Sequence, residues 1–76
     1  NADLSNATMI SAFLFEAYLN GADLSNANLR FANLHGADLT NADLTNADLT
    51  SVNWNTTTCP DGTNSDDNGD TCENNL

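Results

Sequence analysis

The segment from residue 64 to residue 70, near the C-terminus, is rich in side chains that could bind a metal ion. Oxygen-bearing side chains stand there at alternate positions, at Asn64, Asp66, Asn68 and Asp70. Oxygen ligands at alternate positions, followed by a glycine such as Gly69, build the first half of a calcium loop. The spacing predicts a calcium site formed by the first three side chains and the carbonyl of Asp70, or else a polar turn without metal.

This segment resembles the first half of an EF-hand loop or of a thrombospondin type 3 repeat. The second half does not match, because Asn75 stands where the EF-hand loop carries its bidentate Glu, and Glu73 comes two residues earlier. No flanking helices are expected. The calcium loop and the polar turn therefore stay open as alternatives, and the chain requires no other cofactor.

Cys59 and Cys72 bracket this segment and are the only cysteines of the chain. A disulfide between them would stabilise the fold by about 3 kcal/mol and would imply an oxidising compartment. The alternative is two reduced thiols, and zinc is disfavoured because the single histidine, His35, is distant in sequence. We predict the disulfide, and with it an extracellular or cell-surface location, with the periplasm as a further option.

The first residue also bears on the location. The chain begins at Asn1, inside a repeat and without an initiator Met. We therefore expect an exported chain whose signal segment has been removed, or a piece cut from a longer protein.

The overall charge excludes several classes of function. The 76 residues carry a net charge of −10, and Arg30 is the only strong cation. Nucleic-acid binding needs clustered Lys and Arg, so it is not expected. No run of residues is apolar enough to insert into a membrane. No nucleophile–base pair or phosphate loop is present, so we predict that the chain is not an enzyme.

A five-residue repeat makes up most of the chain before this segment. Residues 37–51 read ADLTN ADLTN ADLTS, and looser copies precede them. Eleven repeats follow without insertion or deletion, with central residues at Leu4, Met9, Leu14, Leu19, Leu24, Leu29, Leu34, Leu39, Leu44, Leu49 and Trp54. A small residue, Ala or Val, stands two positions before each. Such regular self-similarity predicts a solenoid.

The spacing within the repeat also predicts the backbone. Ala and Leu lie two residues apart, so both point to one side of an extended segment. The next Ala is three residues further on, so the chain must turn between repeats, at Asn and Gly positions that favour turns. A helix fits badly, because residues five apart wander around its surface.

Over residues 2–56 this pattern resembles the pentapeptide-repeat family, whose consensus is A(D/N)LXX. The resemblance implies an all-β fold, a right-handed quadrilateral β-helix of about three coils with four repeats in each. The recurrence of ADLSN at residues 2–6 and 22–26 agrees with a coil of twenty. We divide the chain into a solenoid, residues 1–56, and a disulfide-closed cap, residues 57–76, that seals the lumen below Trp54.

Two outward features of this solenoid could serve function. Coils of twenty would stack Asp3, Asp23 and Asp43 in a column, which is either a cation ladder or phosphate mimic, or, as we favour, a solvated face bonded to nearby hydroxyls. Large apolar side chains also point outward, near the N-terminal end, at Ile10, Phe13, Phe15, Tyr18 and Phe31. These predict an interface, or a surface covered by a preceding segment or by the C-terminal tail.

The function predicted is that of a non-catalytic extracellular structural module that stacks with copies of itself. The open N-terminal coil would offer unpaired backbone groups to another chain. Two N-terminal ends would close as a dimer, whereas head-to-tail contacts would propagate as a filament, the arrangement favoured by the sequence. One alternative is an acidic DNA mimic that binds a DNA-binding enzyme such as gyrase. Another is a calcium-stabilised protein-binding module.

Overall fold

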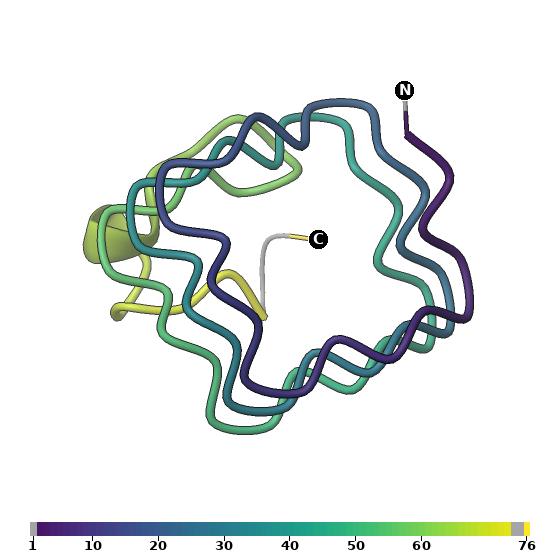
Figure 1. Cartoon of the computed structure of the whole chain (residues 1–76). Helices are drawn as coiled ribbons and strands as arrows, with labels where there is room; N and C mark the ends of the chain where they lie inside the picture. The colour runs from purple at the N-terminus through teal and green to yellow at the C-terminus, as the bar shows by residue number, and fades with distance from the viewer. Residues whose placement is uncertain (1, 74–75) are drawn as a thin grey trace.

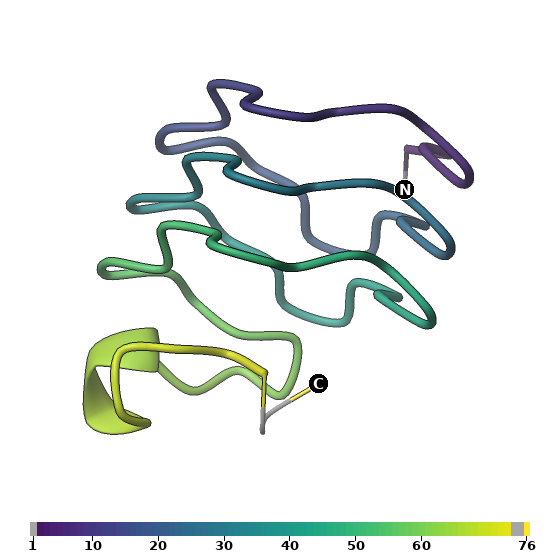
Figure 2. The same ribbon diagram turned by 90° about the horizontal axis from the view of Figure 1, so that it is seen from below.

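Residues 2–61 wind into three four-sided coils of twenty residues each, in a computed structural model that describes residues 2–73 and 76 (Figures 1 and 2). Parallel bridges join residues twenty positions apart, for example Asp3 to Asp23 and Asp23 to Asp43. Figure 2 shows the coils one above another, with the C-terminal segment at one end of the stack. Four repeats therefore make one coil, as the resemblance implies.

Backbone hydrogen bonds hold neighbouring coils together. The N–H of Leu24 donates to the carbonyl of Asp43 at 2.8 Å, and the N–H of Asp43 donates back to the carbonyl of Ala22 at 2.9 Å. Each side is too short to extend this pairing, so the sides contribute isolated bridges rather than long strands. The one helical element among the described residues is the 3-10 helix η1 (Ser65–Asp67).

The turn geometry at the corners explains which residue types occupy the fifth position of each repeat. From Asn6 to Thr56 every fifth residue has a positive φ, between 57° and 72°. At the corner of Asn26, the N–H of Ala27 donates to the carbonyl of Leu24 at 3.1 Å. A bond over three residues with positive φ at the third is typical of a type II turn, which favours Gly and Asn there. Asn or Gly occupies six of these eleven positions.

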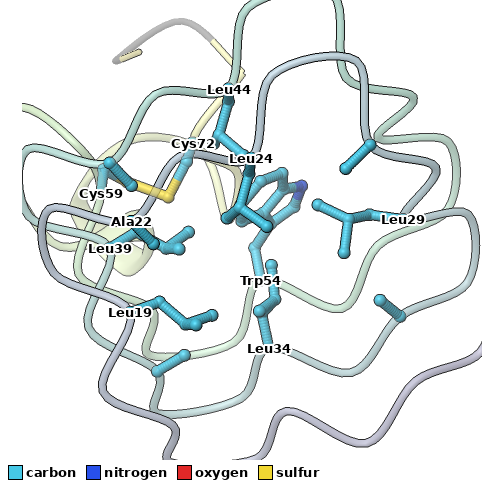
Figure 3. Packing of buried hydrophobic residues seen from close by; sticks show 14 residues of the cluster. Leu19, Ala22, Leu24, Leu29, Leu34, Leu39, Leu44, Trp54, Cys59 and Cys72 are labelled. Carbon is cyan, nitrogen blue, oxygen red and sulfur yellow. A yellow bond between two sulfur atoms is a disulfide. The ribbon is translucent and has the colours of Figure 1, made fainter. Parts of the chain in front are cut away.

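The Ala and Leu rows fill the lumen, and the middle coil is the best buried. Figure 3 shows the Leu side chains pointing inward around Trp54. Leu24, Leu29, Leu34 and Leu39 have no exposed surface, whereas Leu4 in the first coil is only half-buried. The reason is geometric: only the middle coil has a neighbour on both sides.

The ladder of bridges extends beyond residue 56, where the sequence pattern predicts the end of the solenoid. Thr58 bridges Asp38, and Thr57 and Cys59 are fully buried at the positions of Ala and Leu. The hydroxyl of Thr57 donates to the carbonyl of Leu34 at 2.7 Å, which satisfies this polar group inside the lumen. Residues 57–61 thus form a twelfth repeat that completes the third coil.

Two structural absences hold for residues 2–73 and 76. No helix in them has the length and apolar character needed to cross a membrane. No buried side-chain nitrogen or oxygen in them lacks a hydrogen-bond partner.

Burial predicts a graded cost of truncating the Leu row. Leu29→Ala should lower the free energy of unfolding by about 2–5 kcal/mol because it leaves a cavity in a fully packed lumen. Leu4→Ala should cost less, since Leu4 is half-buried. Leu29→Asp should unfold the chain, because it buries an unpaired charge. Urea unfolding followed by far-UV circular dichroism measures all three, and equal losses at Leu29 and Leu4 would contradict the gradient.

The corner geometry predicts a second effect. Asn41 is exposed and has a φ of 61°. Asn41→Val should destabilise the chain by about 1–2 kcal/mol because a β-branched side chain clashes in this conformation. Asn41→Gly should be close to neutral. Thr8→Val is the control, since Thr8 is exposed and extended, and thermal unfolding that ranks the control with Asn41→Val would refute the explanation.

Candidate functional site

The C-terminal segment folds back along the last side of the third coil. After the turn at Asp61 and Gly62, Asn64 forms an antiparallel bridge with Thr58. The N–H of Cys59 donates to the carbonyl of Thr63 at 2.7 Å, and the N–H of Ser65 donates to the carbonyl of Thr57 at 2.8 Å. The cap is shorter than the sequence predicts, because residues 57–61 belong to the third coil, and from here on the name means residues 63–73. Its first residues, Thr63 to Ser65, pair with backbone groups of Thr57 and Cys59 that would otherwise face the end of the stack.

The predicted disulfide is confirmed and fastens the cap. Cys59 and Cys72 are bonded, with their Cα atoms 5.3 Å apart, and both are fully buried beside Trp54 (Figure 3). The Ser65 hydroxyl donates to the carbonyl of Trp54 and accepts from the N–H of Thr57. Trp54 is consequently only 5% exposed, although it lies in the last coil.

The candidate calcium ligands take part in hydrogen bonds within the cap and with the last coil. The side-chain oxygen of Asn64 caps η1 by accepting from the N–H of Asp66 at 2.8 Å. The Asn68 amide donates to the hydroxyl of Thr63 at 2.7 Å and to the carbonyl of Asn64 at 3.0 Å. The N–H of Asp70 donates to the carbonyl of Ser65. These contacts fit the polar turn.

No three His, Cys, Asp or Glu side chains within residues 2–73 and 76 gather as a metal site. Asn75, at the position of the missing Glu ligand, lies outside the described residues. Calcium binding at this loop stays a prediction.

A contact between Asp66 and Thr56 was not expected from the sequence. The carboxylate of Asp66 accepts from the N–H of Thr56 at 3.0 Å. Thr56 is a β-branched residue at a φ of 57°, an unfavourable conformation that needs support from its surroundings. The only sequence signal is the misfit of Thr at a corner position. Asp66 therefore has a structural role at the last corner.

The apolar side chains expected outside lie on the surface near the N-terminal end. We call Ile10, Phe13, Phe15, Tyr18 and Phe31 the aromatic patch. Phe13 is 89% and Tyr18 87% exposed. The cap lies at the opposite end of the stack (Figure 2), so it does not cover this patch.

Two neighbours line the aromatic patch. Phe15 stacks on His35, with ring centroids 5.1 Å apart, and the Arg30 guanidinium lies 5.7 Å from the centre of the Phe31 ring. The imidazole of His35 thus packs on an aromatic ring. No pocket opens anywhere in residues 2–73 and 76, and nothing in the arrangement indicates enzyme activity.

The N-terminal end of the stack is open in the described residues. Ala2 is exposed, and Leu4, Ala7 and Met9 are half-buried. The side chains that line the lumen there are therefore partly accessible.

The Asp columns agree with the solvated-face interpretation. The bridges place Asp3, Asp23 and Asp43 above one another. In each case one carboxylate oxygen accepts from the hydroxyl two residues later, at 2.6 Å, as Asp43 does from Thr45. The same oxygen also accepts the backbone N–H of that residue. These charge-assisted bonds stabilise each carboxylate in its ionised form.

The same bonds lower the pKa of several carboxyls. The hydroxyl bond is the largest cause and the backbone N–H bond the next, for Asp3, Asp38, Asp43 and Asp48. A pKa below its unfolded value stabilises the folded state above that unfolded value. This stability is lost as pH falls through the folded value, so the relevant window lies below about pH 4.

Thr45→Ala tests the origin of these shifts. Without the hydroxyl bond, the pKa of Asp43 should rise towards its ordinary value, while that of Asp48, whose partner Thr50 is intact, should stay low. Carboxyl chemical shifts followed by NMR through an acid titration measure both. An unchanged Asp43 pKa would show that the hydroxyl bond is not the cause.

Comparison with known proteins places this geometry in a family. A family model for pentapeptide repeats matches residues 12–51 in eight copies. This chain is similar to HetL, a pentapeptide repeat protein involved in heterocyst differentiation regulation in the cyanobacterium Nostoc. The two sequences are 31% identical, and the crystal structure of HetL matches this fold with a TM-score of 0.63. The match covers 83% of this chain but only 38% of HetL.

A pentapeptide repeat protein from the thylakoid lumen of Arabidopsis thaliana is 28% identical over 88% of this chain and 68% of that protein, with a TM-score of 0.42. Among curated proteins, none matches this chain. The likeness to HetL indicates a right-handed quadrilateral β-helix. Because the matched repeats span more than half of its residues, the chain belongs to the pentapeptide repeat family.

Proposed function

We propose that the chain is a non-catalytic structural module that associates with copies of itself through its open N-terminal end. The observation that carries this proposal is a rim of unpaired backbone groups on the first coil. In the middle coil, the N–H of Asn33 donates to Ala12 and its carbonyl accepts from Leu14, both at 2.9 Å. The equivalent groups of Phe13 have no partner in the described residues. Such an edge is a template for another chain.

The aromatic patch strengthens the same end. Phe13 and Tyr18 are both rim residues and the two most exposed rings of the chain. A partner that pairs with the rim would therefore also cover apolar surface, which favours association by removing that surface from water. Backbone pairing and apolar burial act at one place.

While the cap is in place, a closed dimer is our proposal in preference to the head-to-tail filament that the sequence favours. Head-to-tail stacking needs the C-terminal end of the next copy, where the cap already pairs with Thr57 and Cys59. Two N-terminal ends can instead meet around a two-fold axis. A two-fold axis through the corner between Phe13 and Tyr18 would set Phe13 of one copy beside Tyr18 of the other. It would also keep the two Asp3 side chains apart.

The proposal includes a cellular location, which the disulfide supports. A buried disulfide joins Cys59 to Cys72, and disulfides persist in oxidising compartments. This supports an exported module, at the cell exterior or in the periplasm. The DNA-mimic alternative has less support, because three coils form a short stack and the column of Asp carboxylates is engaged by hydroxyls.

Blocking one rim amide tests the proposal. Thr8→Pro removes a rim N–H that has no partner in the described residues, so the fold should survive, as proline is tolerated at strand edges. Thr8→Ala keeps the N–H and is the matched control. Light scattering coupled to gel filtration should find dimers for the wild type and the control, and at least tenfold weaker association for Thr8→Pro.

The aromatic patch is tested separately. Replacing Phe13 and Phe15 by Ser should weaken the dimer without unfolding the chain, since Phe13 is almost fully exposed and Phe15 is more than half exposed. A wild-type chain that stays monomeric at high concentration would overturn the proposed function.

A further inference from the structure

We propose that the cap occupies the place that the first coil of a second copy would take, and so stops the stack from growing at its C-terminal end. This inference rests on the proposed function, because it assumes that the N-terminal rim pairs with another chain. The surface concerned is the end of the third coil, and the partner that it fits is a copy of this chain.

The register of the solenoid supports a second copy as the partner. The three coils take up residues 2–61, so the first coil of another copy would follow with all four sides aligned. Within the chain, Leu24 donates its N–H to the carbonyl of Asp43. By the same rule Leu44 would donate to Asp3 of the next copy, and Cys59 to Tyr18.

On the last side of the end coil, the cap supplies the hydrogen-bond partners that a second copy would otherwise provide. Cys59 donates its N–H to Thr63, and Thr57 accepts from Ser65. The first side of the end coil is different. The N–H groups of Leu44 and Asn46 have no partner in residues 2–73 and 76, whereas the equivalent groups of Leu24 and Asn26 pair with the next coil at 2.8 Å.

The second side of the end coil shows the same contrast. The N–H groups of Leu49 and Ser51 also lack partners within the described part of the chain, and Leu49 is only half-buried. The equivalent N–H of Leu29 donates to Asp48 at 2.9 Å. The C-terminal end is therefore half a docking surface, open on two sides and obstructed by the cap.

The Asp column does not oppose such stacking more than it opposes the fold itself. A second copy would place Asp3 beside Asp43. The chain already stacks Asp3 on Asp23 and Asp23 on Asp43, with a hydroxyl bond to each carboxylate. The arrangement at the new contact would repeat one that the monomer contains.

A full-length variant with a released cap tests the inference. Cys72→Ser and Cys59→Leu remove the disulfide, and the Leu restores the usual central residue of the repeat. Ser65→Pro removes the N–H that pairs with Thr57 and the hydroxyl that reaches Trp54. Asp67→Asn, at an exposed position of the cap, is the matched control.

Light scattering and electron microscopy should find that the released variant forms elongated particles larger than dimers, while the control stays dimeric. Adding Thr8→Pro should abolish this growth, because the rim N–H of Thr8 would pair with Ala47 of the next copy. A released variant that keeps its circular dichroism spectrum and remains a dimer would overturn the inference and leave the proposed function intact.

Amide hydrogen exchange on the wild-type dimer gives a second test that does not depend on the variant folding. The amides of Leu49 and Ser51 should exchange at least a hundredfold faster than those of Leu29 and Phe31, their counterparts one coil earlier. Equal protection would mean that the C-terminal end is already engaged, which would overturn the inference. A wild-type monomer would instead count against the proposed function.

Discussion

The solenoid depends on the left-handed corner at every fifth residue. A positive φ there turns the chain between sides and lets the next Ala and Leu face the lumen again, from Asn6 to Thr56. Residues without this preference adopt it only because their surroundings fix the backbone. For Phe31 these are the coils on either side, and for Thr56 they are the preceding coil and the carboxylate of Asp66. At Gly36 the absence of a Cβ also leaves room for Glu16, since a Cβ would lie 3.1 Å from its Cγ.

The two ends of the stack solve the problem of the unpaired coil edge differently. At the C-terminal end the chain pairs with its own edge through Thr63 and Ser65 and fastens the cap with a disulfide. At the N-terminal end the rim groups of Phe13 have no partner among residues 2–73 and 76, and aromatic rings border them. A repeat protein whose ends differ in this way can direct its contacts to one end, because every interior coil is already satisfied by its neighbours.

The repeat could be predicted from sequence because one register carries it: Ala and Leu inside, a small polar residue at the corner. The hydroxyl two residues after Asp was also readable as its local partner. The twelfth repeat could not be predicted from sequence, because Thr57 and Cys59 replace the usual Ala and Leu. Thr57 can lie in the lumen only because its hydroxyl donates a hydrogen bond to the carbonyl of Leu34. The contact of Asp66 with Thr56 was hidden too, since it joins residues ten apart in an irregular loop.

The constant spacing of the coil bridges has a consequence for how the chain folds. Every parallel bridge closes a segment of the same length, so no single bridge has to wait for a distant part of the chain. Loop-closure entropy is then nearly equal throughout, and folding can begin at one coil and spread to its neighbours. The middle coil, residues 22–41, is the natural starting point, because growth from it can proceed in both directions along the stack.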